Sequence, residues 1–177
     1  MGVLCLSLGL LQAQAQFSDV EVKAAYLSHF GEYMSLSADV SGTKPASFDI
    51  CVVGDDPIGP ALAHIAVDEQ LGGRPVRILL NKNAADARSC SIAYISASEG
   101  TRTERDLAAL AGDDALTVSD APAFLEHGGM IQFVLQENRV RFLVNLDAVY
   151  RTHVRLSAFL LRVAAMVRGK SQPGVAP

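Results

Sequence analysis

The chain of 177 residues is long enough for one domain with a sizeable core, and 50% of its residues are hydrophobic and 19% charged. This composition excludes a largely disordered chain. A net charge of −4 with no basic stripe argues against a nucleic-acid partner, and the absence of tryptophan leaves few platforms on which bases or sugars could stack.

The first 15 residues predict a signal peptide and therefore export to the periplasm. Residues 2–11 form an apolar run that is too short to span a bilayer, and Ala13-Gln14-Ala15 follows it as a cleavage signal. No charged residue precedes Asp19, so the usual basic start is missing and we expect the segment to be truncated. The alternative is a buried N-terminal helix or strand. We expect residues 16–170 to form a single α/β domain and residues 171–177 a flexible tail.

The middle of the chain alternates helices with buried strands. Ser18 and Glu21 form a capping box, which predicts a helix over 19–34. Further helices are predicted from the turn at 55–60 to about Leu71, from Thr103, and in a short form after a cap at 119–122; strands are predicted at 47–54, 74–80, 91–96 and 115–118. This order predicts an α/β fold with a mostly parallel sheet flanked by helices on both faces.

The last part of the chain predicts a different pattern. Strands at 130–136 and 139–145, joined by a tight turn at Glu137-Asn138, form an antiparallel hairpin that we expect at a sheet edge. A final helix is predicted from Asp147 onward, with basic residues near its C-terminal end. If the strand order is flavodoxin-like, the first and third strands of the sheet are neighbours.

Cys51 and Cys90 are the cysteines that remain once the N-terminal segment with Cys5 is removed. In an exported protein such an even pair predicts a disulfide, and neighbouring first and third strands would bring the two residues together. A bond across about 40 residues would contribute roughly 4 kcal/mol in the chain-entropy model. The alternative is two buried free thiols. No further Cys or His stands at metal-ligand spacing, so we expect no metal and no other cofactor.

Polar residues follow two of the predicted strands and form a candidate ligand site. Asp55 and Asp56 come after the first strand, and Ser119 and Asp120 after the fourth, at the edge where open α/β sheets bind ligands. The favoured alternative is structural, because Asp56 can cap the following helix and Ser119-Asp120 also resembles a cap. The 4 histidines stand in no nucleophile or metalloprotease motif, so we expect no catalytic residues and no enzymatic activity.

The segment around the hairpin carries the most distinctive pattern. Gly128-Gly129 precede the first strand, where glycine permits a tight turn or a close approach of two backbones. Arg139 and Arg141 are two residues apart on the second strand and therefore point to the same face. They could pair with a carboxylate or an anionic ligand. Alternatively, they protect an exposed sheet edge by their charge, and the residues alone leave both interpretations open.

Taken together, these segments resemble the YfiR family. The resemblance rests on 22–27 with Phe30, on 50–57, on Cys90 before a strand ending in Ile95-Ser96, on 116–120 and on the hairpin through Asn145, and it covers about residues 20–168. It implies a homodimeric periplasmic α/β protein that represses a membrane-bound diguanylate cyclase by binding its periplasmic domain. It also implies a disulfide that matches Cys51–Cys90.

The chain departs from the family pattern at three places. The cysteines of a second family disulfide are missing, so redox sensing through that bond is not implied here. Tyr33-Met34-Ser35-Leu36 stands where the first helix of the family runs into Trp-Pro. Leu143 stands where a glutamate follows the Arg-Phe pair, so a partner that contacts this face can differ from that of the family.

We therefore predict a non-enzymatic periplasmic regulator that binds the periplasmic domain of a membrane sensor, a diguanylate cyclase or a histidine kinase, and represses it. The predicted partner-binding residues lie on and beside the hairpin: Gly128, Gly129, Met130, Asn138, Arg139, Arg141, Phe142 and Asn145. The exposed part of the first helix is a second candidate contact, and homodimerisation through an apolar helix surface is expected. The alternative function is a periplasmic solute-binding module that uses Asp55, Asp56, Ser119 and Asp120.

Overall fold

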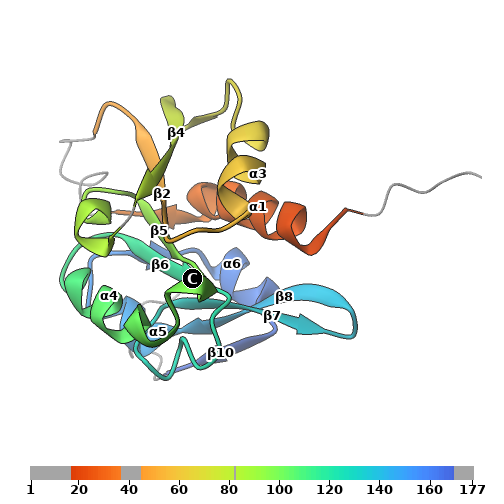
Figure 1. The fold of residues 1–177 in the computed structure, drawn as a ribbon, viewed down its shortest axis with the longest axis vertical. Helices are drawn as coiled ribbons and strands as arrows, with labels where there is room; N and C mark the ends of the chain where they lie inside the picture. Colours follow the sequence, from red (N-terminus) through yellow and green to blue (C-terminus); the bar gives the residue numbers. More distant parts are fainter. Residues whose placement is uncertain (1–16, 37–44, 82, 170–177) are drawn as a thin grey trace, which may run out of the picture.

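The computed structural model describes residues 17–36, 45–81 and 83–169, and its main feature is an eight-stranded mixed sheet (Figure 1). In spatial order the strands are β10 (Met166–Arg168), β8 (Arg139–Asn145), β7 (Ile131–Gln136), β6 (Leu116–Ser119), β5 (Ile92–Ile95), β2 (Phe48–Val53), β4 (Arg74–Asn81) and β3 (Gln70–Leu71). The central strands from β4 to β7 are parallel, whereas β8 is antiparallel to β7 and β3 to β4. The predicted α/β class is confirmed.

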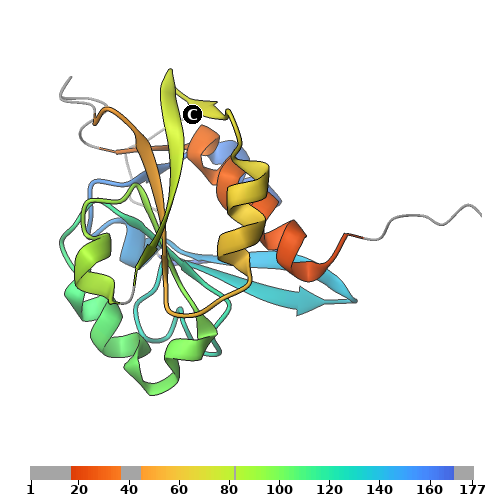
Figure 2. The same cartoon turned by 45° about the horizontal axis from the view of Figure 1, so that its top comes forward.

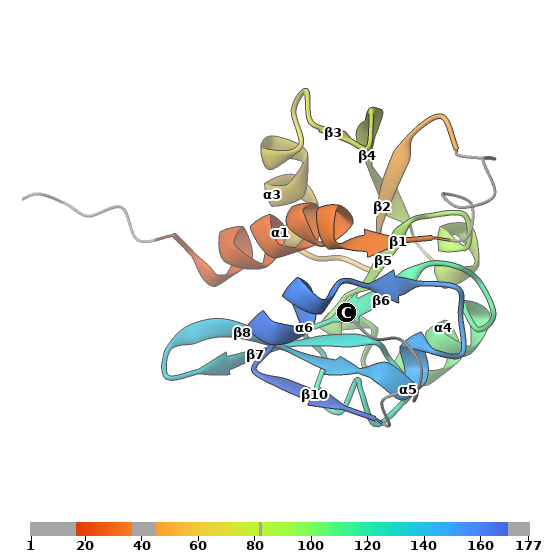
Figure 3. The same cartoon turned by 180° about the vertical axis from the view of Figure 1, so that it is seen from behind.

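Helices cover both faces of this sheet (Figures 1 and 3). One face carries α1 (Asp19–Phe30), α3 (Ile58–Ile65) and α6 (Ala158–Val163); the other carries the short helix η2 (Ala84–Ala87) and α4 (Thr103–Ala109), into which η3 (Ala97–Arg102) leads. Each face has its own apolar core, because buried strands present alternate side chains to the two sides. Within the part of the chain that the structure describes, no helix is long and apolar enough to cross a membrane.

A disulfide joins Cys51 in β2 to Cys90, which lies just before β5. The two strands are neighbours in the sheet, with Cys51 paired to Ala93, so the predicted adjacency of the first and third strands is confirmed. The Cα atoms of the two cysteines are 6.0 Å apart, a separation that a disulfide spans without backbone movement. The bond therefore fastens two strands at the centre of the sheet.

Two predicted helices are shorter in the structure than the pattern indicated. The first ends at Phe30, after which η1 (Gly31–Tyr33) leads into β1 (Met34–Ser35), which pairs with β9 (Arg155–Leu156). The second ends at Ile65 rather than near Leu71, because Asp68 adopts a positive φ of 60° and the chain returns as β3. At the first helix a strand pairing that lies far along the chain overrides local helical spacing, and at the second a tight hairpin between β3 and β4 does so.

The C-terminal region departs further from the prediction. The expected long helix is divided into α5 (Leu146–Val149), β9 and α6, and the described chain ends in β10 rather than in helix. Ser157 starts α6 as a new helix, since its Oγ accepts the Leu160 amide at 3.2 Å. The short helix expected after Ser119 is also absent from this segment, which forms turns because Ala123 has a φ of 57°.

The predicted hairpin of β7 and β8 projects beyond the body of the sheet (Figure 2). Pairing of β6 with β7 stops at Ser119 and Gln132, and β10 pairs only with β8 residues 143–145. The distal half of the hairpin therefore has an unpaired edge on each side among the described residues. The N-terminal part of α1 extends in the same direction as the hairpin, so the two elements lie side by side (Figure 3).

Candidate functional site

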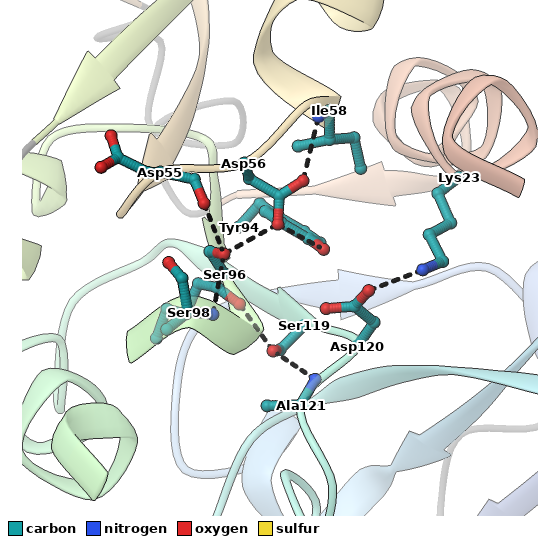
Figure 4. Close-up of polar contacts among 11 residues, drawn as sticks. Lys23, Asp55, Asp56, Ile58, Tyr94, Ser96, Ser98, Ser119, Asp120 and Ala121 are labelled. Atoms are coloured by element: carbon teal, nitrogen blue, oxygen red, sulfur yellow. Dashed lines mark hydrogen bonds and ion pairs between the residues drawn. The ribbon is translucent and has the colours of Figure 1, made fainter. Parts of the chain in front are cut away.

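The carboxyl ends of three central strands bring together a carboxyl-end network of Asp56, Tyr94, Ser96, Ser119 and Asp120 (Figure 4). Asp56 follows β2, and its Oδ1 accepts a hydrogen bond from the Ile58 amide at 2.9 Å. Its Oδ2 accepts one from the Ser96 hydroxyl at 2.8 Å. Both carboxylate oxygens of Asp56 thus hold the chain itself, fixing the start of α3 to the end of β5.

Ser119 is fully buried at the end of β6. Its hydroxyl donates to the Ile95 carbonyl at 2.6 Å and accepts from the Ala121 amide at 2.9 Å. These two bonds tie β6 to β5 and shape the turn that follows. The side chain is therefore engaged within the fold and does not face a ligand.

Asp120 connects the network to α1. The Lys23 ammonium lies 2.6 Å from Asp120 Oδ2, and both side chains are largely covered, at 20% and 23% exposed (Figure 4). Asp120 Oδ1 is buried and accepts no hydrogen bond from the described residues. The nearby phenol of Tyr94 donates a long bond of 3.5 Å to Asp56. Burial, together with the charges of Asp120 and Asp56, raises the pKa of Tyr94 far above its usual value, so the phenol remains a donor.

The four residues of the candidate ligand site do not converge on one cavity. Asp55 and Asp56 line a pocket of about 680 Å³ whose opposite side is formed by Glu99 and Arg102. Asp120 lines a different pocket of about 420 Å³, between α1 and the hairpin. Ser119 lines neither. In residues 17–36, 45–81 and 83–169, no group of three or more His, Cys, Asp or Glu side chains could hold a metal ion.

A pair of buried carboxyl groups lies beside the first of these pockets, where the sequence pattern had indicated only a helix start. Glu99 and Asp106 are 7% and 3% exposed. Arg102 binds Glu99 through two nitrogens at 2.9 and 3.1 Å, whereas Arg105 contacts Asp106 at 3.4 Å. Burial and then the neighbouring Glu99 carboxyl raise the pKa of Asp106. No motif marks such a pair, because its members meet only when η3 and α4 fold together.

The base of the hairpin is tightly packed. A Cβ atom at Gly129 would come within 2.7 Å of Phe124 Cζ and closer to two other ring atoms, so only glycine fits there. Met130, Phe142 and Asn145 are 5%, 1% and 5% exposed. Asn145 bonds the Leu125 carbonyl and the Ala148 amide through its side chain. These predicted partner-binding residues are inside the protein and support the hairpin, so in this structure they do not form a contact surface.

The tip of the hairpin is different, because its polar side chains are free. Glu137 and Asn138 form the turn with φ values of 49° and 57°, as a two-residue hairpin loop requires. Arg139 and Arg141 are exposed, and neither makes a side-chain hydrogen bond or ion pair with the described residues. Their cross-strand partners are Gln136 and Val134, so the two guanidinium groups stand on the hairpin face opposite α1.

A family model for YfiR/HmsC-like proteins matches residues 20–165, which include the network, the disulfide and the whole hairpin. The chain belongs to the YfiR/HmsC-like family. Membership supports, at the level of the family, a periplasmic regulatory role. The resemblance noted from the sequence is thereby confirmed.

A solved structure gives independent support for the fold of this YfiR/HmsC-like protein. The conserved domain protein from Vibrio cholerae O1 biovar El Tor strain N16961 superposes with a TM-score of 0.56 at 13% sequence identity. The match covers 85% of this chain and 60% of that chain, so this chain spans less than two thirds of the longer protein. At this identity the likeness concerns the fold alone.

Proposed function

We propose that this chain is a periplasmic regulator that represses a membrane-bound diguanylate cyclase by binding its periplasmic domain. The observation that carries the proposal is the tip of the projecting hairpin, where Arg139 and Arg141 are exposed and unpaired on one face. Two guanidinium groups on one face suit a carboxylate-bearing surface, to which each can donate two hydrogen bonds. Family membership supports the class of partner.

The mechanism is stoichiometric. A protein that binds the inactive conformation of the sensor more tightly than the active one shifts the sensor toward inactivity without any chemical step. The exposed side of α1 lies on the other side of the hairpin from the two arginines, and we propose it as a second contact. The alternative, a solute-binding module, requires the four polar residues of the carboxyl-end loops to face one ligand. Their division between two pockets, with Ser119 bonded inside, favours the regulator.

The test is recovery of membrane sensors by the tagged chain from solubilised membranes of the cell that produces it, with each recovered protein identified by mass spectrometry. We expect a diguanylate cyclase with the unaltered chain and its loss with the double variant Arg139→Glu, Arg141→Glu. The matched control is Arg151→Glu, Arg162→Glu, which makes the same charge change at exposed arginines outside the hairpin. Recovery of no cyclase by the unaltered chain contradicts the proposal, and equal recovery by both double variants moves the interface away from the tip.

A further inference from the structure

The strand β7 has an unpaired edge on the side of β6. The last residue pair between β6 and β7 is Ser119 with Gln132, whereas β7 continues to Gln136. Beyond this point, among the residues that the structure describes, β7 has a sheet neighbour only on the β8 side. An edge of this kind presents amide and carbonyl groups that a further strand can bind.

The hairpin turn determines which groups point to this edge. In a two-residue hairpin, the residues that flank the turn, Gln136 and Arg139, form a hydrogen-bonded pair. Bonded and non-bonded pairs alternate along an antiparallel ladder, so Val134 also bonds to β8. Phe133 and Leu135 therefore direct their N–H and C=O groups away from β8, toward the free edge.

A groove runs along this edge. The pocket of about 420 Å³ is lined by Gln132, Phe133, Val134 and Leu135 of β7, and its other walls come from Asp19, Lys23, Asp120, Pro122 and Val140. Successive side chains of a strand point to opposite faces, so a pocket that touches four consecutive residues lies along the backbone edge. Leu135 is 57% exposed, although it is a large apolar side chain, and it stands next to Val140 on the face that carries α1.

The groove is acidic at one end. Asp19 and Asp120 each carry a negative charge there, and Lys23 compensates only one of them. Asp120 Oδ1 is buried and accepts no hydrogen bond from the described part of the chain, although desolvating a carboxylate oxygen without a donor is costly. The Tyr94 phenol lies beside Asp120, and a cationic group that entered the groove would add to the charge compensation that Lys23 provides.

We propose that the periplasmic domain of the partner adds an extended segment as a new strand along β7, with an apolar side chain against Leu135 and Val140 and a lysine or arginine at Asp120. Main-chain hydrogen bonds to Phe133 and Leu135 would provide affinity, and the charge at Asp120 would fix the position of the segment. This inference rests on the proposed function and specifies how the partner docks.

The groove and the arginine pair lie on different sides of the hairpin, so one partner can use both. Arg139 and Arg141 stand on the face away from α1, whereas Leu135 and Val140 stand on the face toward it. The added strand would continue the sheet between these two faces. A segment bound in this way lies between β7 and the groove walls that α1 and the loop with Asp120 supply.

The experiment measures the dissociation constant of the full chain for the periplasmic domain of the recovered cyclase, by isothermal titration calorimetry. Leu135→Pro removes the outward N–H without breaking the β7–β8 ladder, and we expect about tenfold weaker binding, the effect of one lost hydrogen bond. Leu135→Ala is the matched control, which keeps the N–H and should weaken binding less. Asp120→Asn, which removes the charge at similar volume, should also weaken binding several-fold.

Hydrogen exchange on the unaltered complex decides the question even if Leu135→Pro folds poorly. We expect the amides of Phe133 and Leu135 to exchange more slowly in the complex than in the free chain. Unchanged exchange at both amides, or a Leu135→Pro variant that binds as the unaltered chain does, overturns strand addition but leaves the regulator intact. Weaker binding of Asp120→Asn alone would point to an isolated cation in the pocket and also overturn it. Absence of any bound cyclase overturns the proposed function itself.

Discussion

The carboxyl-end network and the hairpin tip are both rich in polar side chains, but they use them in opposite ways. In the network, Asp56 and Ser119 satisfy their oxygens within the chain, at distances of 2.6–2.9 Å. At the tip, Arg139 and Arg141 bind nothing among the described residues. The comparison shows that Asp56 and Ser119, at the edge where α/β sheets often bind ligands, serve here to build the fold, while the hairpin tip presents unpaired guanidinium groups.

The largest expected effect on the unfolding free energy is at the base of the hairpin, whose residues are buried and support the fold. Gly129→Ala places a Cβ atom against the buried Phe124 ring, and overpacking of this kind costs about 3 kcal/mol in the free energy of unfolding. Gly128→Ala is the control, since a Cβ atom there meets open space and suffers only the strain of a φ of 96°, about 1 kcal/mol. Urea denaturation measures both, and equal losses would contradict the packing argument.

The next effect tests the network directly. Asp56→Ala leaves the Ile58 amide without its acceptor and leaves the Ser96 hydroxyl only the longer bond to the Asp55 carbonyl, and we expect a loss of about 2 kcal/mol in unfolding free energy. The neighbouring Asp55 is exposed and its carboxylate accepts none of the bonds of the network, so Asp55→Ala should cost less than about 0.5 kcal/mol. A larger loss for Asp55→Ala than for Asp56→Ala would mean that Asp55, and not Asp56, holds the start of α3.

A smaller effect depends on pH. The pKa of Asp106 is raised in the folded chain by burial and by Glu99, so the folded state holds this proton more tightly than the unfolded state does. The stability that the protonated Asp106 contributes is therefore complete below the pKa that this carboxyl group has in the unfolded chain. It is lost as the pH rises through the higher pKa of the folded chain. We expect the unfolding free energy of the unaltered chain, relative to Asp106→Asn, to rise as the pH is lowered. A pH-independent difference would show that the two carboxyl groups do not share a proton.

A contrasting acid provides the internal control for that measurement. Asp49 lies beside Arg77, whose guanidinium donates at 2.6 and 2.8 Å and lowers the pKa of this carboxyl group. The stability that the ionised Asp49 contributes is present above the pKa that this group has in the unfolded chain. It is lost as the pH falls through the lower pKa of the folded chain. Asp49→Asn should therefore change the pH dependence in the opposite sense to Asp106→Asn, and at a lower pH.

The smallest effect on the unfolding free energy is expected at the hairpin tip, where we expect the largest effect on partner binding. Arg139→Glu, Arg141→Glu alters exposed side chains with no partners among the described residues, so the unfolding free energy should stay within about 0.5 kcal/mol of the unaltered chain. Thermal unfolding followed by circular dichroism measures this. A larger loss would place the two arginines in the fold and remove the contrast with the network.

Much of the fold could be predicted because its determinants are local. Buried apolar runs marked the central strands, and the Ser18–Glu21 capping box marked the start of α1, where both of its hydrogen bonds are present. The ends of α1 and of the C-terminal helix could not be predicted, since β1 pairs with β9 and β10 with β8 across long stretches of chain. Helical spacing carries no information about such pairings.

The candidate site was predictable to a similar extent. Strand alternation was enough to place Arg139 and Arg141 on one face. The sequence of the hairpin could not show which of its side chains are buried, such as Phe142, and which are exposed. Burial of these side chains depends on the packing of α1 against the hairpin. The Lys23–Asp120 pair joins side chains 97 residues apart, so no pattern along the chain indicates it.

The position of the disulfide has a consequence for its reduction. Cys51 is fully buried and Cys90 is 3% exposed, and thiol–disulfide exchange needs a thiolate to reach one of the sulfur atoms. An external reductant can therefore attack this bond only when the centre of the sheet opens. The rate of reduction therefore reports how often that opening occurs.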